Sequence, residues 1–346
     1  MLRTLNARHD RFPLLRPFRI SRGVKTVADV VTVEITVGGI TGRGEGVPYP
    51  RYGESVQAAL AAIETVRGPI GEGAGRAELL DLLPPGAARN AVDGALWDLE
   101  ARLAGESVAA RLGLAPPGGA AMAPLATALT VGLDTPAAMA AAAETLAGVP
   151  LLKIKVDQSD PEAQLRAVRA VAPLPRVIVD PNESWTIAEV ERLQPLLAEL
   201  RVDLLEQPLP ADDDGALAGF RPLVPIAADE AVHVAADLGA LAGKYQVVNI
   251  KLDKSGGLTA ALALADAAEA AGFGLMVGCM VCSSLSIAPA WPLAARAAFV
   301  DLDGPLWLAG DRAGGVSARQ GMLMPPEPGF WGGSSRSERK IEGAST

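Results

Sequence analysis

The feature that most constrains the fold is a series of short apolar runs that each end on a charged residue. The runs read LLKIKVD, RVIVDPNE, VDLLEQP, PIAADE and VVNIKLDK, and they lie between residues 151 and 254. A run of Leu, Ile and Val that stops on a charge is typical of a parallel strand whose last side chain points out of the sheet edge. Helical patterns follow most of these runs, so the sequence predicts an α/β fold with chemistry at the strand ends.

The number of strand–helix units suggests a closed ring. Counting from ATALTVG at residue 126, we find about eight units, the number in a (β/α)8 barrel of the TIM type. Active sites in such barrels lie at the carboxyl ends of the strands. We therefore assign residues 121–310 to a catalytic barrel.

Residues 1–120 read differently from the rest of the chain. ADVVTVEITVGGITGRGEG predicts a strand pair around a Gly-rich turn, and RNAVDGALWDLEARLAG predicts an amphipathic helix that ends at Gly105. The mixture indicates a small α+β domain, with LAPPGGAAMAP as its boundary. Residues 311–333 are expected to pack back on this domain, and the polar residues 334–346 are expected to be disordered.

Charge and cysteine content limit the partners. A formal net charge of -9 disfavours nucleic acid and anionic membranes. The sequence contains neither an apolar stretch long enough to cross a bilayer nor the apolar core of a signal peptide. Cys279 and Cys282 resemble half of a redox or zinc site, but the chain has only two His to complete it. We interpret both as reduced thiols, which predicts a cytoplasmic location.

Three acidic residues, Asp180, Glu206 and Asp229, end consecutive predicted strands. A single acid at a strand end most often caps the next helix, and Asp180-Pro181-Asn182 alone reads as a turn. Independent caps would not place acids on three neighbouring strands with lysines on the flanking ones. Three oxygen ligands without His or Cys favour a hard cation, so we predict one Mg²⁺ at this position.

Lysines flank the acids on both sides. Lys153 and Lys155 lie on the second predicted strand, and Lys251 ends the sixth, which is the opposite strand in a ring of eight. A neighbouring ammonium group, a nearby dication and burial each disfavour the charged form of a lysine, which tunes it to abstract a proton near neutral pH. One base on each side of a carbon is the arrangement that inverts a stereocentre.

Other strand ends carry candidate substrate contacts. Asp301 and Asp303 lie two residues apart after the eighth strand, so both carboxylates can hold one ammonium group. A helix cap followed by a turn at Gly304-Pro305 explains the same spacing equally well. Cys279 and Met280 end the seventh strand and Thr130 ends the first, where each can contact a substrate.

Together these motifs resemble the enolase superfamily, specifically its muconate-lactonizing subgroup. The resemblance rests on KIK after the second strand and Lys251-Leu252-Asp253 after the sixth, and no His is placed for the mandelate-racemase type. The segments PPGAARNAVDGALWDLEAR, VDPNESW, LLEQPLPADDD, NIKLDKSGGLT, GCMVC and DLDGPLWLA extend it over nearly the whole chain, and the Asp-x-Asp after the eighth strand is similar to that of the dipeptide epimerases.

The resemblance implies a reaction and a role for each residue. It implies Mg²⁺-dependent epimerisation of a dipeptide at the α-carbon of its C-terminal residue, with L-Ala-D-Glu converted to L-Ala-L-Glu. It implies a homo-oligomer whose first domain caps the barrel. The roles that it implies are metal binding by Asp180, Glu206 and Asp229, proton transfer by Lys155 and Lys251, carboxylate binding by Lys153, amine binding by Asp301 and Asp303, and side-chain recognition by Arg22 or Lys25 in RISRGVKT or by Arg51.

Two alternatives stay open. An o-succinylbenzoate synthase or N-acylamino acid racemase shares the lysines and the acids but has no ammonium group to bind, so Asp301 and Asp303 separate it from a dipeptide epimerase. A non-catalytic, metal-dependent carboxylate-binding protein would need the acids but not the lysine pair.

Overall fold

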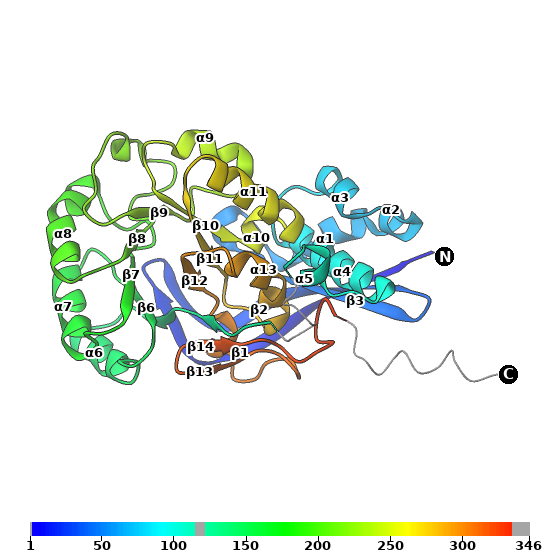
Figure 1. Ribbon diagram of the computed structural model, residues 1–346, viewed down its shortest axis with the longest axis horizontal. Helices are drawn as coiled ribbons and strands as arrows, with labels where there is room; N and C mark the ends of the chain where they lie inside the picture. The colour runs from blue at the N-terminus through cyan, green and yellow to red at the C-terminus, as the bar shows by residue number, and fades with distance from the viewer. Residues whose placement is uncertain (1, 115–121, 334–346) are drawn as a thin grey trace.

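The computed structural model describes residues 2–114 and 122–333. An antiparallel sheet with helices against it lies beside a ring of parallel strands with helices around it (Figure 1). The predicted domain boundary at residue 120 and the predicted disordered tail at 334–346 both lie outside the described residues. No helix in the described ranges is long and apolar enough to cross a membrane.

The ring contains eight parallel strands in chain order. Their bounds are β5 (Leu129–Val131), β6 (Leu151–Lys155), β7 (Arg176–Asp180), β8 (Leu204–Glu206), β9 (Ile226–Ala228), β10 (Val247–Lys251), β11 (Gly274–Gly278) and β12 (Phe299–Asp301). The backbone N–H of Ala128 donates to Val300 O at 2.7 Å, which joins the first strand to the last. The predicted (β/α)8 barrel is therefore confirmed.

Helices cover the outside of the ring unevenly. The long ones are α6 (Pro136–Glu144), α7 (Pro161–Val171), α8 (Ile187–Glu199) and α11 (Leu258–Ala270), and the short ones are α9 (Leu238–Leu241), α10 (Leu252–Ser255), α12 (Ser284–Ile287) and α13 (Trp291–Ala294). Residues next to the helices determine where α7 and α8 begin. The side chains of Asp160 and Thr186 cap these helices by accepting hydrogen bonds from backbone N–H groups of the first turn. Between β8 and β9 the described chain forms only a 3₁₀ turn, Gly215–Leu217.

An apolar floor inside the ring positions the candidate site. One buried layer consists of Ala128, Leu151, Ile178, Leu204, Ala227, Val247, Met276 and Phe299. Successive side chains of a strand alternate between its faces, so the residue two positions later points into the same interior. The three predicted metal ligands each lie two residues after a member of this layer. They follow Ile178, Leu204 and Ala227. The floor therefore closes the barrel below the charged residues.

The N-terminal domain contains a three-stranded antiparallel sheet, β1 (Thr4–Ile20), β2 (Gly23–Val37) and β3 (Ile40–Gly46). Its helices are α1 (Val56–Thr65), α2 (Arg67–Glu72), α3 (Arg76–Leu82), α4 (Ala87–Ala104) and α5 (Val108–Arg111). The predicted strand pair around a Gly-rich turn is confirmed. The expected loop at RISRGVKT is instead the end of the β1–β2 hairpin, whose tip reaches over the barrel (Figure 1).

The helix predicted to be amphipathic is α4, and that interpretation is wrong. It ends at Gly105, whose φ of 66° closes it as expected. Nearly every side of α4 is buried, because it packs on β3 along one side and on α10 and α11 along another. The helix joins the small domain to the barrel and has no solvated face of its own.

The segment after the barrel contacts both domains. Strand β13 (Ser317–Arg319) pairs with β14 (Met322–Met324), which pairs in turn with β4 (Leu125–Ala126) at the start of the barrel. Further on, the N–H of Gly332 donates to Asp98 Oδ1 at 2.6 Å, and Trp331 Nε1 donates to Gly94 O at 3.1 Å. The C-terminal end of this segment therefore lies against α4.

The close approach of β3 to α4 depends on three alternating glycines, Gly42, Gly44 and Gly46. A Cβ atom on Gly44 would lie 2.1 Å from Ala91 O, and one on Gly46 would lie 2.1 Å from Ala87 O. These distances are far below van der Waals contact, and the clashing atoms belong to the helix backbone. Only glycine allows the strand and the helix to lie this close together.

We expect Gly44→Ala to lower the free energy of unfolding by about 2 kcal/mol or more, because overpacking against a rigid backbone forces the two elements apart. Urea denaturation followed by circular dichroism measures the change. The matched control is Gly68→Ala in α2, where an added Cβ meets nothing within 4 Å. Equal unfolding midpoints for the two variants would contradict the packing argument.

Candidate active site

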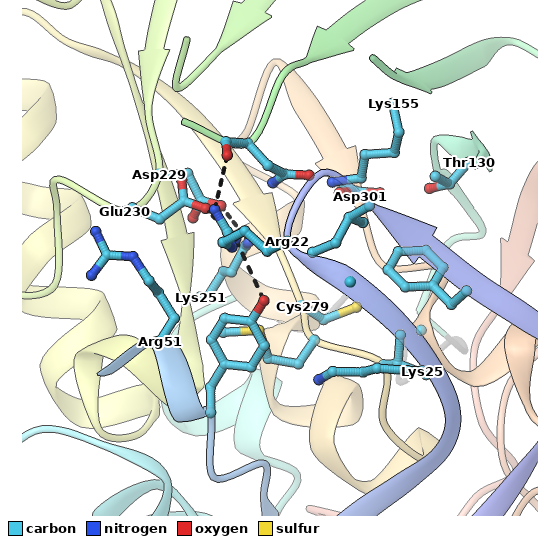
Figure 2. Close-up of a pocket in the computed structure, with 18 of the residues that line it drawn as sticks. Arg22, Lys25, Arg51, Thr130, Lys155, Asp229, Glu230, Lys251, Cys279 and Asp301 are labelled. Atoms are coloured by element: carbon cyan, nitrogen blue, oxygen red, sulfur yellow. Dashed lines mark hydrogen bonds and ion pairs between the residues drawn. The ribbon is translucent and has the colours of Figure 1, made fainter. Parts of the chain in front are cut away.

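A cavity of about 500 Å³ opens at the carboxyl ends of the barrel strands, beneath the β1–β2 hairpin (Figure 2). Most of the residues singled out in the sequence line it. From the barrel these are Thr130, Lys153, Lys155, Asp229, Lys251, Cys279, Met280, Asp301 and Asp303, and from the N-terminal domain Arg22, Lys25 and Arg51. Asp180 and Glu206 are fully buried and do not line the cavity.

Lys155 and Lys251 approach the cavity from opposite strands. Three strands separate β6 from β10 in either direction around the ring, and the two side chains come from different sides in Figure 2. Lys155 Nζ donates to Asp180 Oδ2 at 2.5 Å, and Lys251 Nζ donates to Asp229 Oδ2 at 2.6 Å. Both amines therefore face the cavity while each is anchored to an acid behind it.

Lys153 lies between several acids. Its Nζ donates to Asp301 Oδ2 at 2.8 Å. The same nitrogen lies 2.9 Å from Asp180 Oδ2 and 2.7 Å from Glu206 Oε2. Burial alone would lower the pKa of Lys153, but the charges of Asp180 and Asp301 outweigh burial and raise that pKa well above its usual value. One cationic nitrogen is thus shared by three carboxylates.

The pKa of Lys251 is also raised: burial opposes the charged form, and the Asp229 carboxylate outweighs it. In turn, the lysine charges hold the pKa of Asp180 and of Asp229 below the usual range despite complete burial. The direct ion pairs therefore favour the ammonium form of Lys153 and of Lys251. The sequence expectation rested on a neighbouring lysine, a nearby dication and burial, and it did not include these direct pairs.

Each predicted metal ligand has one oxygen held from behind. Asp180 Oδ1 accepts from the N–H of Asn182 at 2.8 Å. Glu206 Oε1 accepts from Asn249 Nδ2 at 2.9 Å. Burial and then the charge of Asp180 raise the pKa of Glu206 to about 8. The second oxygen of each acid points toward the lysine amines.

In residues 2–114 and 122–333 no three acidic, His or Cys side chains already converge in a metal-binding geometry. The amines of the lysines lie among the three acids instead. Glu206 Oε2 nevertheless accepts no hydrogen bond, although Lys153 Nζ lies 2.7 Å away. A buried carboxylate oxygen without a donor, close to a cationic nitrogen, has the chemistry of a ligand for a hard cation.

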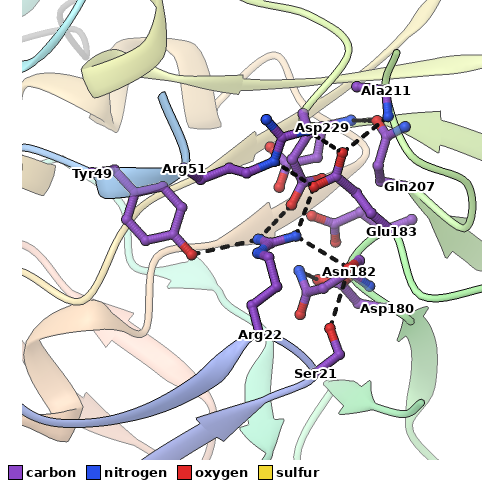
Figure 3. A network of polar contacts seen from close by, with 12 residues as sticks. Ser21, Arg22, Tyr49, Arg51, Asp180, Asn182, Glu183, Gln207, Ala211 and Asp229 are labelled. Atoms are coloured by element: carbon purple, nitrogen blue, oxygen red, sulfur yellow. Dashed lines mark hydrogen bonds and ion pairs between the residues drawn. The ribbon is translucent and has the colours of Figure 1, made fainter. Parts of the chain in front are cut away.

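The arginines at the cavity rim are already paired (Figure 3). Arg22 donates to Glu230 Oε1 at 2.7 Å, to Glu183 Oε2 at 3.0 Å and to Asn182 O at 3.1 Å. Arg51 forms two hydrogen bonds with Glu183, at 2.7 and 2.8 Å. These contacts join the N-terminal domain to residues that flank Asp180 and Asp229.

Lys25 differs from both arginines. Its Nζ lies 4.5 Å from the centre of the Tyr49 ring, and it forms no ion pair with any residue that the structure describes. Burial lowers its pKa. Among the three predicted cations of the N-terminal domain, Lys25 is the one whose amine faces the cavity without a carboxylate.

Asp303 is held in place by two donors at the edge of the cavity. Its Oδ2 accepts from the N–H of Thr130 at 3.0 Å and from Trp307 Nε1 at 3.2 Å. Burial and then the charge of Asp301 raise the pKa of Asp303 to about 6. Asp301 Oδ1 accepts no hydrogen bond, so the pair presents an unsatisfied acidic surface.

The comparisons with known proteins agree with this arrangement. Residues 3–113 match the N-terminal domain of the mandelate racemase / muconate lactonizing enzyme family, and residues 137–330 match the enolase C-terminal domain-like family. The chain belongs to the enolase superfamily.

Two curated members of the superfamily are similar over most of their length. The L-Ala-D/L-Glu epimerase of Escherichia coli (strain K12) is 48% identical over 90% of this chain and 96% of its own. The N-acetyl-D-glutamate racemase of a Pseudoalteromonas species is 42% identical over 86% of this chain and 93% of its own.

Two solved superfamily structures contain a metal and a dipeptide. An enolase family member from Agrobacterium tumefaciens with homology to dipeptide epimerases was solved with sodium and L-Ala-L-Glu. It has a TM-score of 0.91, is 49% identical, and covers 95% of this chain and 100% of its own. The dipeptide epimerase of Methylococcus capsulatus, complexed with Mg and L-Arg-D-Lys, has a TM-score of 0.84, is 35% identical, and covers 94% of this chain and 98% of its own.

Sequence reasoning missed several residues that lie beside the three acids. Asn249 precedes Lys251 by two positions on the same strand face, so its alternation could have identified it. Lys254 and Asn182 gave no such signal, because Lys254 lies on α10 beyond the strand and Asn182 lies in a turn with a φ of 47°. Gln207 Oε1 accepts from the N–H of Asp229 at 2.8 Å, a contact that only the fold creates.

Asp253, the acid of the Lys-x-Asp motif, joins the end of β10 to the N-terminal domain. It is 4% exposed, and its Oδ1 accepts from the N–H of Val47 at 2.8 Å and from Asn90 Nδ2 at 2.8 Å. Burial raises its pKa to about 7. The motif thus fixes the end of β10 against α4 and the loop after β3.

Proposed function

We propose that this protein is a dipeptide epimerase that inverts the α-carbon of the C-terminal residue of its substrate, with L-Ala-D-Glu and L-Ala-L-Glu as the pair that it interconverts. The observation that carries the proposal is the placement of Lys155 and Lys251 on opposite strands around one cavity. A carboxylate-binding protein would need no such pair. The similarity to the curated L-Ala-D/L-Glu epimerase supports the same reaction.

The two lysines carry the proton transfer. The amine of one takes the proton from the α-carbon, and the ammonium group of the other returns a proton to the opposite side. Which lysine acts first depends on the epimer that is bound. The apolar floor of the barrel and the overlying hairpin keep water away from the two amines, so the proton returns from the lysine.

We assign one Mg²⁺ to Asp180, Glu206 and Asp229. When bound, it supplies positive charge that stabilises the substrate carboxylate as the α-carbon loses its proton. Six buried carboxyl groups, four buried amines and the guanidinium of Arg22, which pairs with Glu230, surround the position, so the acids outnumber the cations before a metal binds. The six acids are Asp180, Glu206, Asp229, Glu230, Asp301 and Asp303, and the four lysines are Lys153, Lys155, Lys251 and Lys254.

The ends of the substrate meet different groups. We assign the C-terminal carboxylate to Lys153 and the N-terminal ammonium group to Asp301 and Asp303, whose unsatisfied oxygen favours a cation. The glutamyl carboxylate is assigned to Lys25, because Arg22 and Arg51 already pair with Glu230 and Glu183.

A second candidate function is racemisation of an N-acetyl amino acid, and the identity with the N-acetyl-D-glutamate racemase favours it. Both candidates use the lysine pair and a glutamyl side chain. They differ at the amino end, where the dipeptide has an ammonium group and the N-acetyl compound has a neutral amide. Asp303 is therefore the residue that distinguishes them.

Location and assembly belong to the same proposal. Cys279 and Cys282 are both free thiols, which supports a reducing, cytoplasmic compartment. The resemblance to the superfamily supports a homo-oligomer that acts on a small molecule, without nucleic acid or membrane partners.

We expect the protein to exchange the α-proton of both L-Ala-D-Glu and L-Ala-L-Glu for deuterium in D₂O with Mg²⁺, as followed by proton NMR. Lys155→Ala should block exchange from one epimer and Lys251→Ala from the other, each by about 10²–10⁴-fold, because each variant lacks the base on one side. Lys244→Ala, a lysine outside the cavity, is the control. If either active-site variant still converts both epimers, the two-base mechanism is wrong.

We expect Asp303→Asn to lower kcat/KM for L-Ala-D-Glu by about 10–100-fold, because the ammonium group loses a charged hydrogen-bond partner. An Asn side chain can still accept from Thr130 and Trp307, so the local structure is kept. Turnover of N-acetyl-D-glutamate should change less than threefold or improve. An equal loss with both substrates, or none with the dipeptide, would reject the assignment of the amine.

We expect Lys25→Met to lower kcat/KM for L-Ala-D-Glu by about 10–100-fold and to leave the neutral dipeptide L-Ala-D-Met nearly unchanged, because only the glutamyl carboxylate needs the cation. Steady-state kinetics with both dipeptides measures the difference. Lys25→Arg, which keeps the charge, is the matched variant and should retain the preference for glutamate. A parallel loss with both dipeptides would assign Lys25 a structural role.

A further inference from the structure

Lys254 is a buried lysine of the site that the proton-transfer scheme does not use. It lies on α10, directly after β10, and is 2% exposed. Its Nζ donates to Asp229 Oδ1 at 2.6 Å, to Asn249 O at 3.0 Å and to the backbone oxygen of Asp229. A buried ammonium group is costly unless it is fully paired, so these contacts need an explanation.

The contacts leave Lys254 no capacity for a substrate. An ammonium group has three hydrogens, and three acceptor oxygens surround this one. Lys153, Lys155 and Lys251 line the cavity, whereas Lys254 does not. Its effect on the site must therefore pass through Asp229 and Asn249.

Lys254 decides how the Asp229 carboxylate is oriented. Oδ1 is bound to Lys254 on the side away from the cavity, and Oδ2 is bound to Lys251, which faces the cavity. Without the first contact, the carboxylate could rotate and offer either oxygen. Lys254 also acts on a second acid through Asn249. It binds the backbone oxygen of Asn249, whose side chain donates to Glu206 Oε1.

Of the three acids, only Asp229 has its rear oxygen held by a charged group. The rear oxygens of Asp180 and Glu206 accept from a backbone N–H and a side-chain amide. A neutral donor costs the cation nothing, whereas a positive charge near the site also repels it. The presence of a lysine at this position is explained if fixing Asp229 outweighs that repulsion.

We propose that Lys254 is a positioning residue that fixes Asp229 so that Oδ2 alone is offered to the divalent cation. The proposal rests on the proposed function only in taking Asp229 as a ligand. Partners behind metal ligands typically change metal affinity by about 10–100-fold when they are removed. The sign of the change separates positioning from charge: loss of positioning weakens cation binding, and loss of a repelling charge strengthens it.

The test is the dissociation constant for Mg²⁺, measured by isothermal titration calorimetry on the full chain. We expect Lys254→Met to weaken Mg²⁺ binding by about 10–100-fold. Lys254→Gln keeps an N–H donor for Asp229 without the charge, so it should bind Mg²⁺ as tightly as wild type or more tightly. Lys244→Met, which removes a lysine outside the cavity, should leave the dissociation constant unchanged.

Turnover gives a second readout. Lys254→Met should need about 10–100-fold more Mg²⁺ than wild type to reach half of its own maximal turnover, because the loss acts through cation binding. Lys251→Met should instead lose turnover while still binding Mg²⁺. If Lys254→Met does not fold, Lys254→Ser, which leaves space for water, carries the same expectations.

The outcomes are distinct. Unchanged or tighter Mg²⁺ binding by a folded Lys254→Met variant would overturn the positioning role, even where only its thermal stability falls. If wild type binds no Mg²⁺, the metal assignment of the proposed function fails first. If wild type binds Mg²⁺ but exchanges no α-proton, the reaction is wrong and the role of Lys254 stands on the binding data alone.

Discussion

The barrel mouth depends on a balance of buried charges. Charged groups removed from water are stable only when they are paired and hydrogen-bonded. Strand register creates the pairs: Lys155 is aligned with Asp180 across β6 and β7, and Lys251 lies near Asp229 from the neighbouring strand β9. A slip of one residue would turn these side chains toward the surrounding helices. The apolar floor below, which lies two residues before each of the three acids, therefore matters as much as the charges themselves.

This dependence on register explains what the sequence could predict. Strand ends are visible because an apolar run and its final charge are adjacent in the chain, as in LLKIK and RVIVD. Strand β1 was not predicted, because charges and prolines interrupt the apolar side chains along its 17 residues. Asn182 and Lys254 were not predicted, because a turn and the short helix α10, and not strand alternation, bring them to the acids. The all-round burial of α4 depends on two partners that are distant in sequence.

The N-terminal domain completes the site, and its cations can be ranked only by their partners. Arg22, Lys25 and Arg51 look equivalent in the sequence, since each lies near the end of a strand or in a loop. In the folded chain the arginines join the hairpin and the following loop to acids that flank the proposed metal ligands. The two arginines hold the N-terminal domain on the barrel. Asp253 does the same through its contacts with Val47 and Asn90. Lys25 is left to face the cavity.

The acidic pair at the amino end explains how one site can resemble both a dipeptide epimerase and an N-acetyl amino acid racemase. Two carboxylates this close repel each other, and a bound ammonium group relieves that repulsion. A proton on Asp303 relieves it as well, since its pKa is raised to about 6. The protonated acid can then donate to the oxygen of a neutral amide. Under the proposed function, the same pair can therefore accept either amino end, and the charge of Asp303 decides which one binds better.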